Sequence, residues 1–468
     1  MVRIANVTGS TLAGQTANAP RPFRLPLTDK LIDLSFESGS MARCLGIGLL
    51  SAAVLLVSPS VGHAQSTPVS PQAVIAHYPD MAEAMFGDAL SGAMELRRAI
   101  DRLVAAPSQE SLAAARTAWI DARQWYQKTE GFRFGNPIVD EWEGRVNAWP
   151  LDEGLIDYVD TDTYGEESNE NELYTANVIA NRKLKIGTGT VDASTITPEL
   201  VRSLHEAADS EANVATGYHA IEFLLWGQDL NGTGPGAGDR PFTDYDVSNC
   251  TNGNCDRRTA YLKAATDLLV TDLAEMADNW KTGGAARADY LARDNNGALS
   301  SILAGLGSLS YGELAGERMK LGLILHDPEE EHDCFSDNTH NSHYYDVVGM
   351  WSIYSGTVER YDGSVLEGPG LQDLAAEQAP EAQQRLEALM QDALGKFQVI
   401  KEKAESGAMA YAQMIGPGNA EGNALVQAAI DSLIAQTRGI EGLVKAMNLT
   451  IEVQGSDSLG KPGSASAQ

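Results

Sequence analysis

Apolar residues recur every three or four positions along most of the chain, which is the spacing of one face of an α-helix. Two predicted helices carry clear start signals: Ser108 precedes a helix that runs to Phe132, and Thr197 with Pro198 precedes a helix over Glu199–Trp226. The other long helices are predicted over Ala73–Ala106, Cys255–Lys281, Gly297–Leu325, Pro380–Ile415 and Asn419–Met447. Because no set of alternating strands accompanies them, the predicted fold class is all-α, built as packed helical bundles.

One long stretch interrupts the helical pattern. Residues 232–254 are rich in Gly, Pro and Asp, which is typical of a loop, and we expect this loop to join two lobes with about four long helices each. The predicted lobes are residues 65–245 and residues 246–454. Gly363–Gly370 is a smaller break, and residues 455–468 are predicted to form a disordered tail.

Residues 41–64 have the features of a signal peptide. A positive charge at Arg43 precedes a 13-residue apolar run, and small residues up to Ala64 fit a cleavage site. We expect translation to start at Met41, with residues 1–40 as an upstream extension outside the translated protein. A cleaved signal peptide predicts export to the periplasm or the cell envelope.

Composition narrows the classes of function. Of the 468 residues, 43% are hydrophobic, which is enough to build a core and excludes global disorder. Lys and Arg number 34 against 64 Asp and Glu, so the formal net charge is −30. Nucleic acid is therefore not an expected partner, because binding to its phosphates needs a basic face. The same charge is compatible with a protein that attracts cations.

The cysteines fit an exported protein. Cys250 and Cys255 bracket a turn-rich loop, and in an oxidising compartment we expect them to form a short disulfide. Cys334 then stays unpaired.

The most informative pair of side chains is His219 and Glu222. Their spacing of three puts them on one face of a helix, where they could hold one cation together. The surrounding residues are hydrophobic and bury that face, and a buried His and Glu need polar partners. The alternative is therefore a satisfied His–Glu hydrogen bond inside a core.

Acidic and imidazole side chains also gather over residues 329–343. Three histidines lie within 12 residues there, and imidazole with carboxylate oxygen suits iron, manganese or zinc. The alternative is a solvated acidic loop in which Asp337 or Thr339 caps a helix that begins near His340. The candidate ligands in this stretch are Glu331, His332, Asp337 and His340.

A third stretch, Asn136–Tyr158, mixes two tryptophans with six carboxylates. Such a mixture is compatible with the lining of a pocket or with an irregular segment anchored on a bundle, and the sequence does not separate the two. Asp152 and Glu153 lie in this stretch.

Four blocks of the sequence resemble the imelysin family, also called peptidase family M75. The block Asn213–Asp229 contains the Gly-x-His-x-x-Glu signature, and three others resemble further family motifs in the family's order. These three are Trp149–Glu153, Glu317–Met319 and Glu331–His340. Within the family, the chain looks most similar to the iron-regulated imelysin-like proteins of bacterial envelopes.

The resemblance implies a helical, two-lobed fold with a site at the lobe interface and a part in iron uptake at the periplasm or outer membrane. We expect a metal ion or an iron-bearing ligand as partner, with iron or another divalent metal bound, and the resemblance allows an outer-membrane transport partner. His219 and Glu222 are the expected direct ligands, and the stretch 329–343 is expected to add others from the second lobe. Supporting roles are expected for Asp152, Glu153, Glu317 and Arg318.

Two other interpretations stay open. One is a metal-dependent endopeptidase of the M75 type, with His219 as metal ligand and Glu222 as ligand or base. A metallopeptidase needs three protein ligands, an open position and a general base, and the sequence assigns no catalytic residue with that certainty. The other is a structural His219–Glu222 pair inside an interaction protein.

Overall fold

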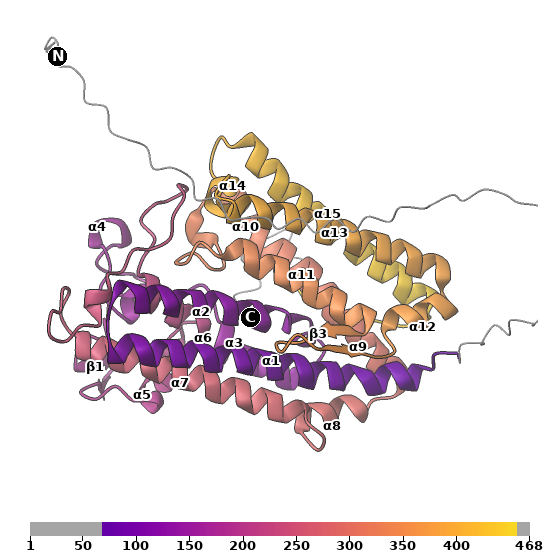
Figure 1. Cartoon of the computed structure of the whole chain (residues 1–468), viewed down its shortest axis with the longest axis horizontal. Helices are drawn as coiled ribbons and strands as arrows, with labels where there is room; N and C mark the ends of the chain where they lie inside the picture. Colours follow the sequence, from indigo (N-terminus) through magenta and orange to yellow (C-terminus); the bar gives the residue numbers. More distant parts are fainter. Residues whose placement is uncertain (1–67, 456–468) are drawn as a thin grey trace, which may run out of the picture. The chain divides into compact units, whose positions relative to one another are not determined.

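The computed structural model describes residues 68–455 (Figure 1). The predicted extension 1–40 and signal peptide 41–64 lie outside the described residues, as does all of the predicted tail except Gly455. Helices make up most of the described chain, and the strands form only two short hairpins, so the fold is all-α as predicted. Among the helices of residues 68–455, none combines the length and the apolar character needed to cross a bilayer.

The first two helices, α1 (Pro71–Ala105) and α2 (Gln109–Gln127), form an antiparallel pair. The predicted cap at Ser108 is confirmed: its hydroxyl accepts from the Ser111 amide at 3.1 Å, and the Ser111 hydroxyl accepts from the Ser108 amide at 2.9 Å. Helix α2 ends earlier than predicted, and a 3-10 turn at Glu130–Phe132 follows. The amide and the hydroxyl of Thr129 both donate to the Tyr126 carbonyl, which tightens the chain there.

The single helix predicted over Glu199–Trp226 is wrong. The structure has α5 (Pro198–Leu204), a 3-10 turn at Ala207–Asp209, and then α6 (Gly217–Trp226). Gly217 has φ +82°, and a Cβ there would lie 2.5 Å from the Val146 carbonyl oxygen. The chain therefore passes so close to α3 (Pro137–Asn147) that only glycine fits, and α6 starts anew from that point.

Helix α7 (Cys255–Trp280) agrees with its prediction, and α8 (Ala285–Leu291) follows it. The helix predicted over Gly297–Leu325 is helical throughout, but its centre differs in type. It consists of α9 (Asn295–Ser308), a 12-residue π-helix at Leu309–Lys320, and α10 (Leu321–Leu325). A π-helix brings residues five apart onto one face, and Arg318 Nε accordingly donates to Glu313 Oε1 at 3.0 Å.

The C-terminal helices are α11 (Thr339–Ser355), α12 (Leu371–Gln378), α13 (Pro380–Glu405), α14 (Tyr411–Ile415) and α15 (Ala420–Ala446). The helix predicted over Pro380–Ile415 stops at Glu405, because Gly407 turns the chain with φ +71°. The expected capping of α11 by Asp337 or Thr339 is also wrong. The Thr339 hydroxyl accepts from the Asp333 amide instead, and the Asp337 carboxylate accepts from the Gly236 amide.

The remaining elements are short. Strand β1 (Lys183–Ile186) pairs antiparallel with β2 (Gly189–Asp192), and β3 (Thr357–Glu359) pairs antiparallel with β4 (Val365–Glu367). Their registers place Leu184 opposite Val191 and Val358 opposite Leu366. A short helix and three further 3-10 turns complete the chain: α4 (Thr161–Tyr164), Glu153–Leu155, Phe242–Asp244 and Pro328–Glu330.

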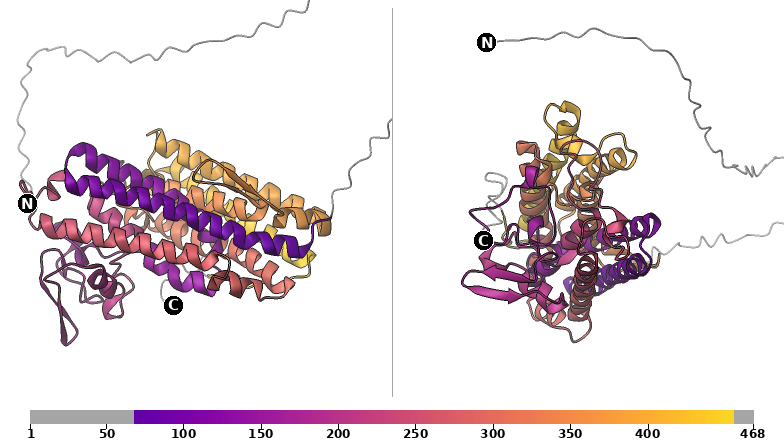
Figure 2. Two further views of the ribbon diagram at one scale, coloured as in Figure 1. Left: turned by 60° about the horizontal axis from the view of Figure 1, so that its bottom comes forward. Right: turned by 90° about the vertical axis from the view of Figure 1, so that its left-hand side faces the viewer.

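The long helices pack along one another. Helix α1 lies against both α2 and α7, and α13 lies against α15 (Figures 1 and 2). Helix α11 packs on α2 on one side and on α13 on the other, so it joins the two sets of helices. Helix α7 belongs to the predicted C-terminal lobe and lies against α1 of the predicted N-terminal lobe. The lobe boundary near residue 245 stays a prediction.

Candidate metal centre

Helix α6 carries the His219–Glu222 pair, and all ten of its residues are buried. His219 is 1% exposed and Glu222 is fully buried. Nδ1 of His219 lies 2.9 Å from Oε2 of Glu222, so the two side chains are hydrogen-bonded one turn apart. Glu222 therefore occupies one nitrogen of the imidazole, and the other nitrogen, Nε2, faces away from it toward α2.

The segment before α11 closes over this pair. The Ser336 amide and hydroxyl donate to Glu222 Oε1 at 2.9 and 2.6 Å. Asp333 places Oδ1 4.0 Å from Nδ1 of His219, and its Oδ2 accepts from Asn338 and Ser342. An acidic residue from the second half of the chain thus reaches the pair on α6, as the proposed site requires.

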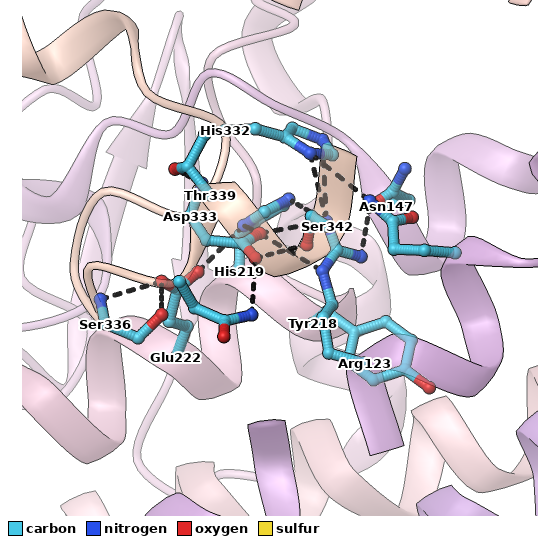
Figure 3. A network of polar contacts seen from close by, with 12 residues as sticks. Arg123, Asn147, Tyr218, His219, Glu222, His332, Asp333, Ser336, Thr339 and Ser342 are labelled. Atoms are coloured by element: carbon cyan, nitrogen blue, oxygen red, sulfur yellow. Dashed lines mark hydrogen bonds and ion pairs between the residues drawn. The ribbon is translucent and has the colours of Figure 1, made fainter. Parts of the chain in front are cut away.

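His219, His332 and Asp333 form a compact group of metal-ligand types (Figure 3). One ligand atom from each lies within 4.8 Å of the others, and all three residues are buried. The rings of His219 and His332 have centroids 4.9 Å apart. Burial, helped by the nearby Arg123 and Arg318 guanidiniums, lowers the pKa of both histidines well below the usual value, so both rings are neutral near pH 7.

Arg123 of α2, which was not among the residues predicted from the sequence, reaches into the centre of this group (Figure 3). Its Nη2 lies 3.1 Å from His219 Nε2 and 3.1 Å from Asp333 Oδ1. The same atom lies 3.4 and 3.5 Å from the two ring nitrogens of His332. Nε also donates to Asp333 Oδ1, and Nη1 donates to Asn147. A cationic nitrogen therefore lies where a shared metal ion would have to lie.

The arginine fixes the tautomer of His219. A guanidinium has donors only, so His219 Nε2 must accept from Nη2. The single proton of the neutral ring is then on Nδ1 and is donated to Glu222. This is the tautomer in which a carboxylate orients a histidine whose Nε2 lone pair is available to a metal.

Aromatic rings surround the guanidinium. Its carbon lies 6.0, 5.7 and 5.2 Å from the ring centroids of Trp119, Tyr126 and Tyr218. Trp119 and Tyr126 flank Arg123 at helical spacing on α2, so a lone arginine on a buried aromatic face is the sequence signal that could have found it. These contacts stabilise the charge in a dry environment.

The Trp149–Glu153 block reaches the group through its tryptophan alone. The Trp149 ring meets the His332 ring edge-on, with centroids 5.8 Å apart. Asp152 instead accepts a hydrogen bond from Asn171 at 2.6 Å. Burial, with the nearby Glu329, raises the pKa of Glu153 to about 8. Neither carboxylate belongs to the three-residue group.

The other predicted ligands also lie outside that group. The Asp337 carboxylate accepts from the backbone amide of Gly236. His340 Nε2 lies 3.2 Å from the side-chain amide nitrogen of Asn341. Burial raises the pKa of Glu331 well above its usual value. The other two residues predicted in support, Glu317 and Arg318, lie on the π-helix. Arg318 forms buried ion pairs with Glu130, Glu313 and Asp346, and Glu317 is half-buried.

The cysteines are placed as expected. Cys250 and Cys255 form a disulfide at the start of α7, and Cys334 is a free thiol beside the histidine group. Burial and the surrounding carboxylates raise the pKa of the Cys334 thiol well above its usual value, so it stays protonated and is a poor nucleophile.

Comparison with known proteins assigns the chain to a family. The sequence model of imelysin, peptidase family M75, matches residues 82–440. The chain belongs to the imelysin family. An iron-regulated protein A of Synechococcus elongatus is 23% identical over 364 residues, covering 78% of this chain and 85% of the relative. The crystal structure of a candidate iron-regulated protein A precursor from Parabacteroides distasonis has the same fold, with a TM-score of 0.56 at 16% identity, covering 82% of this chain and 97% of that one.

In this member of the imelysin family the donor set suits a metal, but the present spacing does not. Two imidazole nitrogens and a carboxylate oxygen are ligands for iron, manganese or zinc. Bonds of about 2.1 Å hold two ligand atoms at most about 4.2 Å apart. Since Arg123 Nη2 lies 3.1 Å from the ligand atoms of His219 and Asp333 and 3.4 Å from His332 Nδ1, a metal at its place fits only if the guanidinium leaves and the ligands draw together.

Proposed function

We propose that this protein binds a divalent metal ion, iron foremost, through His219 Nε2, His332 and Asp333. The observation that supports this most is the convergence of these three side chains on one cationic atom, Arg123 Nη2. Glu222 orients His219 from behind, as an outer carboxylate does in many metal sites. The preference for iron comes from the relatives, two of which are described as iron-regulated protein A or its precursor.

Arg123 acts in this proposal as an internal competitor. Without metal, the guanidinium neutralises Asp333 and keeps the buried site satisfied. When a metal enters, it takes over the contacts to His219 and Asp333, and the side chain of Arg123 withdraws. Binding therefore exchanges one cation for another, which makes the ion releasable and keeps the site from holding an uncompensated buried charge.

We propose that the protein works in the cell envelope and passes its ion to, or takes it from, a transport partner of the outer membrane. The Cys250–Cys255 disulfide supports an oxidising compartment, and the predicted signal peptide supports export. The net charge of −30 raises the local concentration of cations near the protein.

Capture is favoured over peptide hydrolysis because of how Glu222 is used. A metallopeptidase needs a carboxylate that is available to activate a water. Here Oε2 of Glu222 is engaged with His219, and Oε1 accepts two hydrogen bonds from Ser336. Both oxygens are committed to neighbouring side chains, which is the arrangement of an orienting group.

The test is metal titration of the purified protein and three variants under anaerobic conditions, with Fe²⁺ and Mn²⁺ as probes. His219→Ala abolishes binding at this site while the helical circular dichroism persists. Arg123→Met tightens binding at least about tenfold, because a competitor worth as little as ~1.4 kcal/mol has gone. The same variant lowers the metal-free unfolding free energy by about 3–5 kcal/mol, since Asp333 loses its partner, and metal restores the stability.

Arg116→Met is the matched control. Arg116 is also on α2, and its guanidinium donates to the carbonyls of Leu225 and Arg240, outside the metal group. This variant leaves metal affinity unchanged. Equal affinities in the parent, Arg123→Met and His219→Ala would contradict the proposed site, and chelator-sensitive cleavage of an unfolded protein would favour the endopeptidase.

A further inference from the structure

Helix α11 repeats the arrangement seen on α6. His343 and Asp346 are one turn apart on α11, as His219 and Glu222 are on α6. The exposed fraction of His343 is 1%, and Asp346 is fully buried. The His343 ring faces the His332 ring almost in parallel, with an interplanar angle of 14° and centroids 6.4 Å apart. The His332 ring thus lies close to both His219 and His343.

The polar atoms of this second pair are unsatisfied within the protein. Among the described residues, neither Nδ1 nor Nε2 of His343 has a hydrogen-bond partner, and neither has Oδ1 of Asp346. Oε1 of Gln127 likewise has no hydrogen-bond partner among the described residues, while its Nε2 contacts His332 Nδ1 at 3.5 Å. Buried polar atoms of folded proteins are nearly always paired, because leaving them unpaired costs free energy.

The chemistry of these atoms indicates what would pair with them. A carboxylate oxygen, an amide oxygen and the lone-pair nitrogen of a neutral imidazole are all acceptors. The other oxygen of Asp346 accepts from Arg318 Nη1 at 3.2 Å, so Oδ1 alone of that carboxyl group lacks a partner. Tyr411 meets the His343 ring edge-on at 5.4 Å. The carboxylate oxygen of Asp346 and the imidazole of His343 are of the ligand types that bind divalent cations of the iron, manganese or zinc class.

We propose that His343 and Asp346 hold a second cation position, close to His332 of the first, and that this position takes a partly hydrated divalent ion. Two side-chain ligands leave coordination positions for water. The ion class rests on the proposed function, but the position is independent of it, because none of these atoms takes part in the His219 group. The protein then has a capacity of two ions in one buried polar region.

Metal counting distinguishes the two positions. The full-length protein is dialysed anaerobically against Fe²⁺, and separately against Mn²⁺, and the ions per chain are measured by elemental analysis. The parent protein binds two ions, the double variant His343→Leu with Asp346→Asn binds one, and His219→Ala binds one. His326→Ala, which removes a half-buried histidine elsewhere, still binds two.

Thermal melting checks that the double variant is folded, so that a lost ion cannot be attributed to unfolding. His343 makes no hydrogen bond within the described residues. After Asp346→Asn the amide oxygen still accepts from Arg318, which keeps its ion pairs with Glu130 and Glu313. The metal-free double variant therefore still folds and melts cooperatively. The metal-induced rise in melting temperature is smaller than in the parent. A parent that binds one ion, lost in His219→Ala and kept in the double variant, would overturn the second position and leave the proposed function intact. One ion lost only in the double variant would support the second position and contradict the first.

Discussion

At the scale of single residues, His219 is set up by neighbours of fixed hydrogen-bonding character. Arg123 can only donate to Nε2, and Glu222 receives the proton on Nδ1. Because burial keeps the ring neutral, no proton has to leave before a metal binds Nε2. The histidine is therefore prepared for coordination by its surroundings.

Glu153 gives a test of how burial controls charge near the site. Its pKa is raised from 4.5 to about 8, so ionisation of this carboxyl group costs free energy in the folded protein. In the unfolded chain the same group ionises near pH 4.5. The stability that this group contributes is complete below pH 4.5 and is lost as the pH rises to 8. Glu153→Gln removes that loss. In urea unfolding, the unfolding free energy of the variant rises relative to that of the parent across this pH range, by up to about 5 kcal/mol at pH 8. A constant difference between pH 4.5 and 8 would refute the assigned burial effect.

The residues of the site were partly predictable. His219 and Glu222 stand out by their spacing, and His332 by the cluster of histidines around it. Asp333 was missed because a carboxylate in an acidic stretch carries no distinguishing local signal. Arg123 was missed because its one signal, the aromatic face of its helix, does not show which polar residues it contacts. Their roles come from contacts between residues far apart in the sequence: Arg123 contacts His219, 96 positions away, and Asp333, 210 positions away.

At the scale of elements, the start of α6 decides where His219 points. The chain reaches α6 through Gly217, whose positive φ and close approach to Val146 exclude a side chain. Sequence periodicity predicts one helix through this region because the apolar spacing continues across the break, and nothing local reveals the neighbouring backbone of α3. The π-helix at Leu309–Lys320 escapes prediction for a similar reason, since its register is set by packing.

Replacement of Gly217 tests this element. Gly217→Ala puts a methyl group 2.5 Å from the Val146 carbonyl oxygen in an unfavourable backbone conformation, and we expect a loss of about 3 kcal/mol or more in unfolding free energy. Metal affinity falls with it, because α6 shifts relative to Arg123. Gly87→Ala is the control, since Gly87 is inside α1 with open space around it. This variant gains up to ~1 kcal/mol of unfolding free energy from helix propensity. Equal effects of the two substitutions in denaturant unfolding would show that the close approach is unimportant.

At the scale of the whole molecule, the site depends on helices far apart in sequence. Arg123 comes from α2, His219 from α6, and His332 and Asp333 from the segment leading into α11. Helix α11 packs on α2, which holds that segment over α6. Composition and periodicity were enough to predict the helices and the fold class. The convergence of these elements was not predictable from spacing, because it depends on how the helices pack; the resemblance to the imelysin family indicated only that the blocks belong together.

The central claim is that a metal and the Arg123 guanidinium compete for one position beside His219 Nε2. Anomalous diffraction at the iron edge, from crystals grown anaerobically with Fe²⁺, locates the ion directly. We predict an iron peak about 2.1 Å from His219 Nε2, with His332 and Asp333 drawn in and Arg123 Nη2 displaced from its contacts. An iron peak elsewhere with Arg123 still between His219 and Asp333, or iron bound to Glu222 and Nδ1 of His219, would contradict the account.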